Sequence, residues 1–82
     1  MIRVLYFARF RETLGTASED IDGVAGDTVA ELVVKLVAER GEAWKVLKGG
    51  DAHCAVNQEQ VDMAHVLADG DELALFPPVT GG

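Results

Sequence analysis

The chain has 82 residues, of which 49% are hydrophobic, and its 14 acidic and 7 basic side chains give a formal net charge of −7. This length suits one small domain, and the apolar share is too high for a disordered chain. The negative charge would repel nucleic acid, and no apolar run approaches the ~20 residues of a membrane span, so we expect neither partner. One cysteine allows no internal disulfide and no signal peptide is recognisable, which together favour the cytoplasm.

The first predicted element is a strand over Met1–Ala8. Its apolar side chains alternate between two faces, with Ile2, Val4 and Tyr6 on one and Leu5 and Phe7 on the other. Such a strand is either covered on both sides or keeps one face for a partner. A short helical turn over Arg9–Leu14 is expected to end at Gly15, and Thr16–Ile21 is predicted to form an edge strand.

The clearest predicted element is a helix over Thr28–Arg40. Thr28 and Glu31 have the spacing of a capping box, with Asp27 as a competing N-cap. One apolar stripe recurs at helical spacing, formed by Val29, Leu32, Val33, Leu36 and Val37. Gly41 lies just beyond the predicted end, and the stripe predicts a helix that packs against a sheet.

Shorter elements are predicted in the second half of the chain. In order they are a short helix Glu42–Lys48 with Trp44 and Leu47 inward, a turn at Gly49–Asp51, a strand Ala52–Asn57, a tight turn at Asn57–Gln58, a strand stub Gln60–Val61, a turn at Asp69–Asp71 and a strand Glu72–Phe76. The order is β-β-α-β-β with short extras. It indicates an α+β domain with one main helix packed on one face of a mixed sheet.

The body of the chain shows no convincing active site. His53 and Cys54 are adjacent, so a strand would point them to opposite faces, and no further metal ligands stand at suitable spacing near them or His65. We expect Cys54 to be a packing residue and both histidines to be surface or packing residues. Asp69 and Asp71 are explained by turn chemistry, and no metal site or bound cofactor is predicted.

The C-terminal stretch Phe76-Pro77-Pro78-Val79-Thr80-Gly81-Gly82 is the distinctive one. Two prolines end the strand at Phe76, which divides the chain into a domain over 1–76 and an extended tail over 77–82. The tail can span roughly 20 Å at ~3.3–3.6 Å per residue. Gly81 and Gly82 leave its carboxylate sterically open, a shape that suits delivery of the carboxylate into a narrow pocket of another protein.

The terminal carboxylate is ionised at neutral pH and is therefore a poor electrophile. ATP could activate it as an acyl-adenylate. Attack by sulfide would then give a thiocarboxylate, and attack by a lysine amine would give an isopeptide conjugate. The residues alone leave both outcomes open.

The segments IRVLYFARFRETLG, AVNQEQV and DGDELALFPPVTGG, the acidic second strand and the Thr-Val-x-x-Leu helix resemble the small, sulfur-carrier subunits of molybdopterin synthase. The resemblance spans essentially the whole chain, and FPPVTGG is its most specific part. It implies a ubiquitin-like β-grasp fold with the first and last strands side by side at the centre of the sheet. One departure is Gln60, where family members often have an apolar residue.

The resemblance also implies a function in molybdenum cofactor biosynthesis. A ubiquitin-activating-like adenylating enzyme would use ATP on Gly82, and sulfur would follow to give the thiocarboxylate. The tail, with Pro77, Pro78, Val79, Thr80 and Gly81 lining or threading the channel, would insert into the large synthase subunit and pass sulfur to cyclic pyranopterin monophosphate. Two carriers would flank a dimer of large subunits, and the catalytic residues would lie on that subunit, so the chain is expected to be a carrier rather than an enzyme.

Phe7 and Phe76 are predicted to share the outer face of the sheet and to anchor both partners. Alternatives remain a sulfur carrier for another pathway of the thiamin type, a ubiquitin-like protein modifier, and a plain interaction domain whose Gly-Gly end is incidental.

Overall fold

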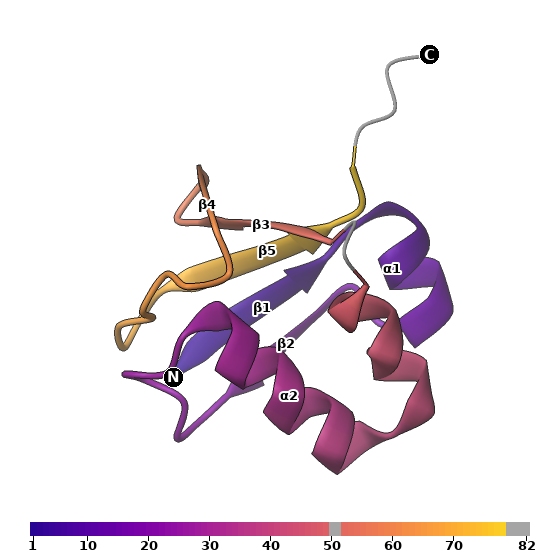
Figure 1. Cartoon of the computed structure of the whole chain (residues 1–82), viewed down its shortest axis with the longest axis horizontal. Coiled ribbons are helices and arrows are strands. Elements are labelled where there is room, and N and C mark those ends of the chain that lie inside the picture. Colours follow the sequence, from indigo (N-terminus) through magenta and orange to yellow (C-terminus); the bar gives the residue numbers. More distant parts are fainter. Residues whose placement is uncertain (50–51, 79–82) are drawn as a thin grey trace.

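A computed structural model describes residues 1–49 and 52–78 and shows a five-stranded mixed sheet with helices on one side (Figure 1). The strands are β1 (Ile2–Tyr6), β2 (Ser18–Ile21), β3 (His53–Val56), β4 (Glu59–Val61) and β5 (Glu72–Phe76). The helices are α1 (Ala8–Leu14), α2 (Val29–Arg40) and the 3₁₀ helix η1 (Glu42–Lys48). The predicted α+β class is confirmed.

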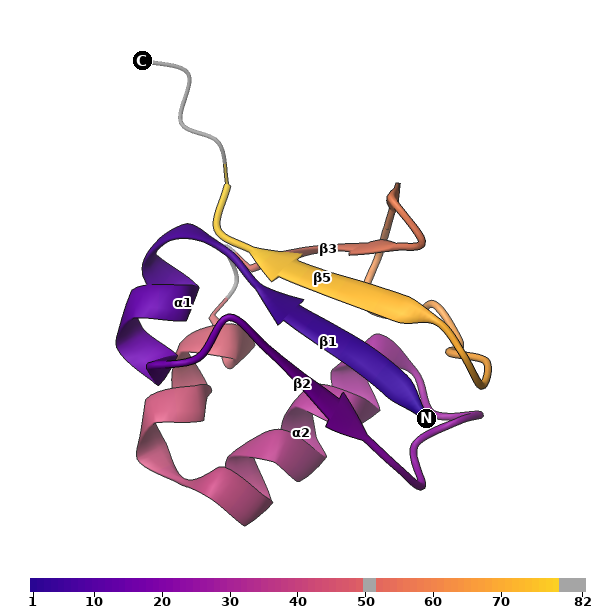
Figure 2. The ribbon, with the colours of Figure 1, turned by 180° about the vertical axis from the view of Figure 1, so that it is seen from behind.

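The sheet has the strand order β2-β1-β5-β3-β4, which makes β5 its central strand. β1 and β5 are parallel neighbours, as Figures 1 and 2 show, and the other three pairings are antiparallel. The β1–β5 register pairs Leu5 with Ala74 and Tyr6 with Leu75. The first and last strands therefore lie side by side, as the resemblance implied, and β2 is an edge strand as predicted.

The hydrophobic core lies between the sheet and the helices. Its most deeply buried side chains are Ile2, Val4, Tyr6, Phe10, Val29, Leu32, Leu36, Leu47, Cys54, Leu67, Leu73 and Leu75. The inward set of β1 is thus the Ile2, Val4 and Tyr6 set, and α2 buries all of its predicted stripe except Val37, which is only partly covered. At ~1.5–3 kcal/mol for each fully buried Leu or Val, this stripe dominates the docking of α2.

The start of α2 is fixed by the predicted capping box. The Thr28 hydroxyl accepts the Glu31 N–H at 3.1 Å, and the Thr28 N–H donates to the Glu31 carboxylate at 2.8 Å. Asp27 is not the N-cap, because its carboxylate pairs with the Lys35 ammonium at 2.6 Å. Thr28 prevails because its side chain and its backbone both bond to the first turn.

A polar cluster joins four elements at the side of the core. The Tyr6 hydroxyl donates to Glu19 of β2 at 2.7 Å and accepts the Trp44 indole N–H at 3.2 Å. Glu19 also accepts from the Arg40 Nε at 2.9 Å. Burial and the Glu19 hydrogen bond raise the pKa of Tyr6 above its ordinary value, so the hydroxyl keeps its proton.

Several predicted boundaries shift in the structure. The first strand ends at Tyr6 rather than Ala8, because Ala8 has a positive φ of 52° that turns the chain into α1. The second strand begins at Ser18 rather than Thr16. Asn57 and Gln58 form the predicted tight turn, with φ of 51° and 71°.

The third strand spans His53–Val56 rather than Ala52–Asn57, and the fourth spans Glu59–Val61 rather than Gln60–Val61. The predicted short helix after α2 is present as 3₁₀, with Leu47 buried and Trp44 partly buried. The predicted turn at Gly49–Asp51 falls partly outside the described residues. No helix in the two described ranges is both long and apolar enough to cross a membrane.

Candidate docking face and root of the C-terminal segment

The point where the chain leaves the sheet is the end of the central strand β5. Its last residue, Phe76, pairs with His53 of β3 in antiparallel register. Pro77 and Pro78 follow outside any strand, because they have no N–H with which to extend the ladder. The predicted sulfur-bearing Gly82 and the predicted threading residues Val79, Thr80 and Gly81 lie outside the described residues.

The sheet face opposite the helices carries a patch of small and apolar side chains. The register places Leu5, Ala74 and Ala55 in one row across β1, β5 and β3. All three are partly exposed, whereas their neighbours along each strand point into the core. We call Leu5, Phe7, Ala55, Ala74 and Phe76, together with His53, the open-face patch. The two-sided apolar pattern of the first strand therefore reflects one buried and one open face.

Phe7 stands at the aromatic end of this patch. It is 43% exposed, its backbone is extended, and its N–H donates to the Leu75 carbonyl at 3.1 Å. The β1–β5 pairing therefore continues one residue beyond the strand, which sets Phe7 level with Phe76 on the open face. The structure thus brings together the two aromatic residues that the sequence singled out.

His53 completes the aromatic end, and sequence reasoning had not given it this place. Its ring lies against the Phe76 ring with centroids 6.0 Å apart and an interplanar angle of 18°. Both side chains are only partly buried. The signal that could have found the contact is register, because pairing the two strands sets His53 opposite Phe76.

The other margins of the patch are polar. Gln60 of β4 pairs with Ala55 and is exposed, so the family's apolar position is here an amide at the β4 edge. At the opposite end the Arg3 guanidinium pairs with the Asp20 carboxylate at 3.2 Å. The apolar area is thus bounded by polar side chains on two sides and reaches the root of the tail on a third.

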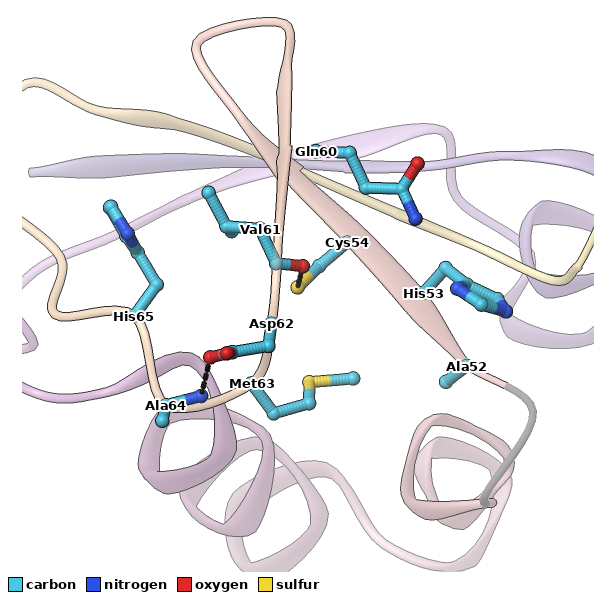
Figure 3. A pocket seen from close by; sticks show the side chains of 9 residues that line it. All are labelled: Ala52, His53, Cys54, Gln60, Val61, Asp62, Met63, Ala64 and His65. Carbon is cyan, nitrogen blue, oxygen red and sulfur yellow. Dashed lines mark hydrogen bonds between the residues drawn. The ribbon is translucent and has the colours of Figure 1, made fainter.

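An open concavity borders β3 and β4 but lacks the features of an active site (Figure 3). Cys54 is 1% exposed, its thiol donates to the Val61 carbonyl at 3.3 Å, and burial raises its pKa, so it is a packing residue as predicted. The Asp62 carboxylate accepts the Ala64 N–H at 2.9 Å. His53 and His65 lie at opposite ends of the concavity. Within 1–49 and 52–78 no three His, Cys, Asp or Glu side chains form a group that could hold a metal.

Comparisons with known proteins give the same picture as the geometry. Residues 4–82 match the ThiS family model. The molybdopterin synthase sulfur carrier subunit of Escherichia coli (strain K12) is 45% identical over 84 residues, covering 100% of both chains. The crystal structure of small archaeal modifier protein 1 from H. volcanii superposes with a TM-score of 0.74 at 27% identity, covering 95% of this chain and 97% of that one.

A complex of subunits 1 and 2 of molybdopterin-converting factor from Helicobacter pylori 26695 contains a chain that superposes with a TM-score of 0.68 at 27% identity. The match covers 99% of this chain and 97% of that one. The neighbours share the ubiquitin-like β-grasp fold that the sequence predicted. The chain therefore belongs to the ThiS family and groups with the sulfur carrier subunits of molybdopterin synthase.

Proposed function

We propose that this chain is the sulfur carrier of molybdopterin synthase in molybdenum cofactor biosynthesis. The full-length similarity to the carrier subunit of E. coli supports this assignment. The observation that carries it is the placement of the tail root: the central strand β5 ends at Phe76 beside Phe7, at the aromatic end of the open-face patch. A partner that covers this patch receives the residues after Phe76 at the edge of its contact.

The proposed chemistry starts at the carboxylate of Gly82. One carboxylate oxygen attacks the α-phosphorus of ATP on a ubiquitin-activating-like enzyme, and pyrophosphate leaves. Hydrosulfide then attacks the carbonyl carbon, the C–S bond forms, and AMP leaves with the bridging oxygen. The product is a thiocarboxylate whose sulfur is a soft nucleophile.

The tail would then deliver this sulfur to cyclic pyranopterin monophosphate in the large subunit. The absence of a side chain on Gly81 and Gly82 permits a narrow channel, while Pro77 and Pro78 restrict the root and Val79 and Thr80 line the channel. We further propose the heterotetramer of two carriers on a dimer of large subunits, in the cytoplasm. On this account the catalytic residues belong to the large subunit, and the chain acts as carrier and co-substrate without a bound cofactor of its own.

Docking and chemistry are separated in this proposal. Leu5, Ala55 and Ala74 supply a nearly flat apolar contact, and Phe7 and Phe76 supply aromatic anchors beside the tail. Aromatic residues at the centre of a contact commonly dominate binding energy. The same patch would serve the activating enzyme and the large subunit in turn, because both must reach the tail.

The test is reconstitution with purified large subunit and cyclic pyranopterin monophosphate. The thiocarboxylated chain is expected to support molybdopterin formation, and the carboxylate form is not. Failure of the thiocarboxylated chain with an active large subunit would contradict the pathway assignment.

A second candidate is a ubiquitin-like protein modifier, favoured by the superposition on small archaeal modifier protein 1. In that case mass spectrometry of cellular protein would detect lysine side chains linked to Gly82. A defect confined to thiamin synthesis on deletion would instead indicate a carrier for that pathway.

A further inference from the structure

We infer that His53 is a positioning residue for the C-terminal segment: by stacking on Phe76 it sets the direction in which the chain leaves the sheet. The inference rests on the proposed function, because it names the residue that aims the segment which that function uses. His53 touches neither the carboxylate nor the reacting atoms in this account. It acts through Phe76.

Backbone hydrogen bonding cannot hold the chain beyond β5. The pair His53–Phe76 is the last of the β3–β5 register, and the next two residues, Pro77 and Pro78, have no amide hydrogen to donate. On the β1 side, the Phe7 N–H reaches the Leu75 carbonyl at 3.1 Å, one residue before Phe76. The Phe76 side chain is therefore the last group of β5 through which the sheet can orient the segment.

The contact on that side chain is a ring on a ring. Centroids 6.0 Å apart fall within the 4.5–7 Å range of favourable aromatic pairs, and the rings are close to parallel. Both residues are partly exposed on the open face, so solvent competes for the Phe76 ring if the imidazole is removed. Without it, the Phe76 χ1 angle gains access to additional rotamers and the segment root gains additional directions.

The consequence for the reaction is a population effect. A partner that accepts the tail in one direction binds only the molecules in which the root points that way, and its apparent affinity falls by that fraction. The chemical step within the bound complex is unaffected. Loss of an aromatic contact of this kind corresponds to an increase of about two- to tenfold in KM for the carrier, with kcat retained.

The experiment measures ATP–pyrophosphate exchange by the activating enzyme as a function of carrier concentration, for the full chain and three variants. His53→Ala is expected to raise KM about two- to tenfold at unchanged kcat, and His53→Phe to restore the wild-type KM because it keeps a ring. His65→Ala is the matched control, since it removes an imidazole from outside the open-face patch, and it should leave both constants unchanged. Circular dichroism establishes that each variant is folded, and His53→Leu, which keeps apolar bulk without a ring, replaces the alanine variant if that one is unfolded.

A second readout separates this inference from the proposed function. Three-bond couplings from the backbone nitrogen to Cγ report the χ1 populations of Phe76 in the free chain. One dominant rotamer in the wild type and in His53→Phe, with averaging in His53→Ala, supports positioning even if the wild-type chain shows no exchange activity, a result that would count against the proposed function alone. Unchanged Phe76 couplings in His53→Ala, or a wild-type KM for that variant, would overturn the role of His53.

Discussion

The most informative single side chain on the open face is Phe7. It is the N-cap of α1, where its side chain makes no capping hydrogen bond, and it is 43% exposed. We expect Phe7→Asp to keep the domain folded, because aspartate is favoured at an N-cap. The same substitution should weaken binding to the large subunit by about 1–3 kcal/mol, since it places a charge in an apolar contact. Isothermal titration calorimetry measures the loss.

The matched control for Phe7 is Val34→Asp on α2, on the helical side of the molecule. Val34 is 54% exposed, so the control adds the same charge at a site of similar exposure away from the patch. Equal loss of binding in both variants would point to net charge rather than the patch. Phe76→Asp extends the test to the second predicted anchor, and unfolding of that variant would show that Phe76 is needed by the core.

Asp71 makes the stability of the fold depend on pH. Its carboxylate accepts the Ala68 N–H at 2.8 Å and the Asn57 side-chain N–H at 2.9 Å, and these bonds lower its pKa below the ordinary value of 3.8. A depressed folded-state pKa gives stability that is present above the unfolded pKa and is lost as pH falls through the folded one. We expect the free energy of unfolding to fall below about pH 4, and to fall less in Asp71→Asn. Urea titrations across this range measure it, and equal slopes in both proteins would exclude the role of Asp71.

At the scale of elements, the capping box determines where α2 begins. Thr28→Ala removes the hydroxyl that accepts the Glu31 N–H, and we expect the free energy of unfolding to fall by about 1 kcal/mol. Thr28→Ser keeps the acceptor and should retain most of the stability. Chemical denaturation compares the two. Equal losses would mean that the threonine methyl group matters rather than the hydrogen bond.

The cluster around Tyr6 connects β1, β2, α2 and η1 through three side-chain contacts. Tyr6→Phe removes the donor to Glu19 and the acceptor for Trp44, and should lower the free energy of unfolding by about 1 kcal/mol. A double-mutant cycle with Trp44→Phe isolates the Trp44–Tyr6 contact by chemical denaturation. A coupling energy near zero would show that packing, not the hydrogen bond, orders η1.

For the whole molecule, sequence reasoning succeeded where local chemistry determines structure. The capping box at Thr28, the left-handed Gly15 that ends α1 and the turn at Asn57–Gln58 are each encoded within a few residues, and all three are present. The strand order came from the resemblance rather than from periodicity, because alternation alone does not choose neighbours.

Features that depend on distant contacts were missed or misplaced. The first strand was extended to Ala8, since nothing in the sequence indicates that an alanine adopts a positive φ there. The stacking of His53 on Phe76 and the bond between Glu19 and Tyr6 require strand register, which one sequence does not specify. The placement of Phe7 and Phe76 on one face followed from parallel pairing, whereas their binding role stays a prediction.

The measurement that tests the central claim most directly is the intact mass of the chain after incubation with ATP, its activating enzyme and sulfide. The account predicts a gain equal to the difference between one sulfur and one oxygen atom, confined to the C-terminal peptide and abolished by deletion of Gly82. An unchanged mass with an activating enzyme that converts another carrier under the same conditions would contradict it.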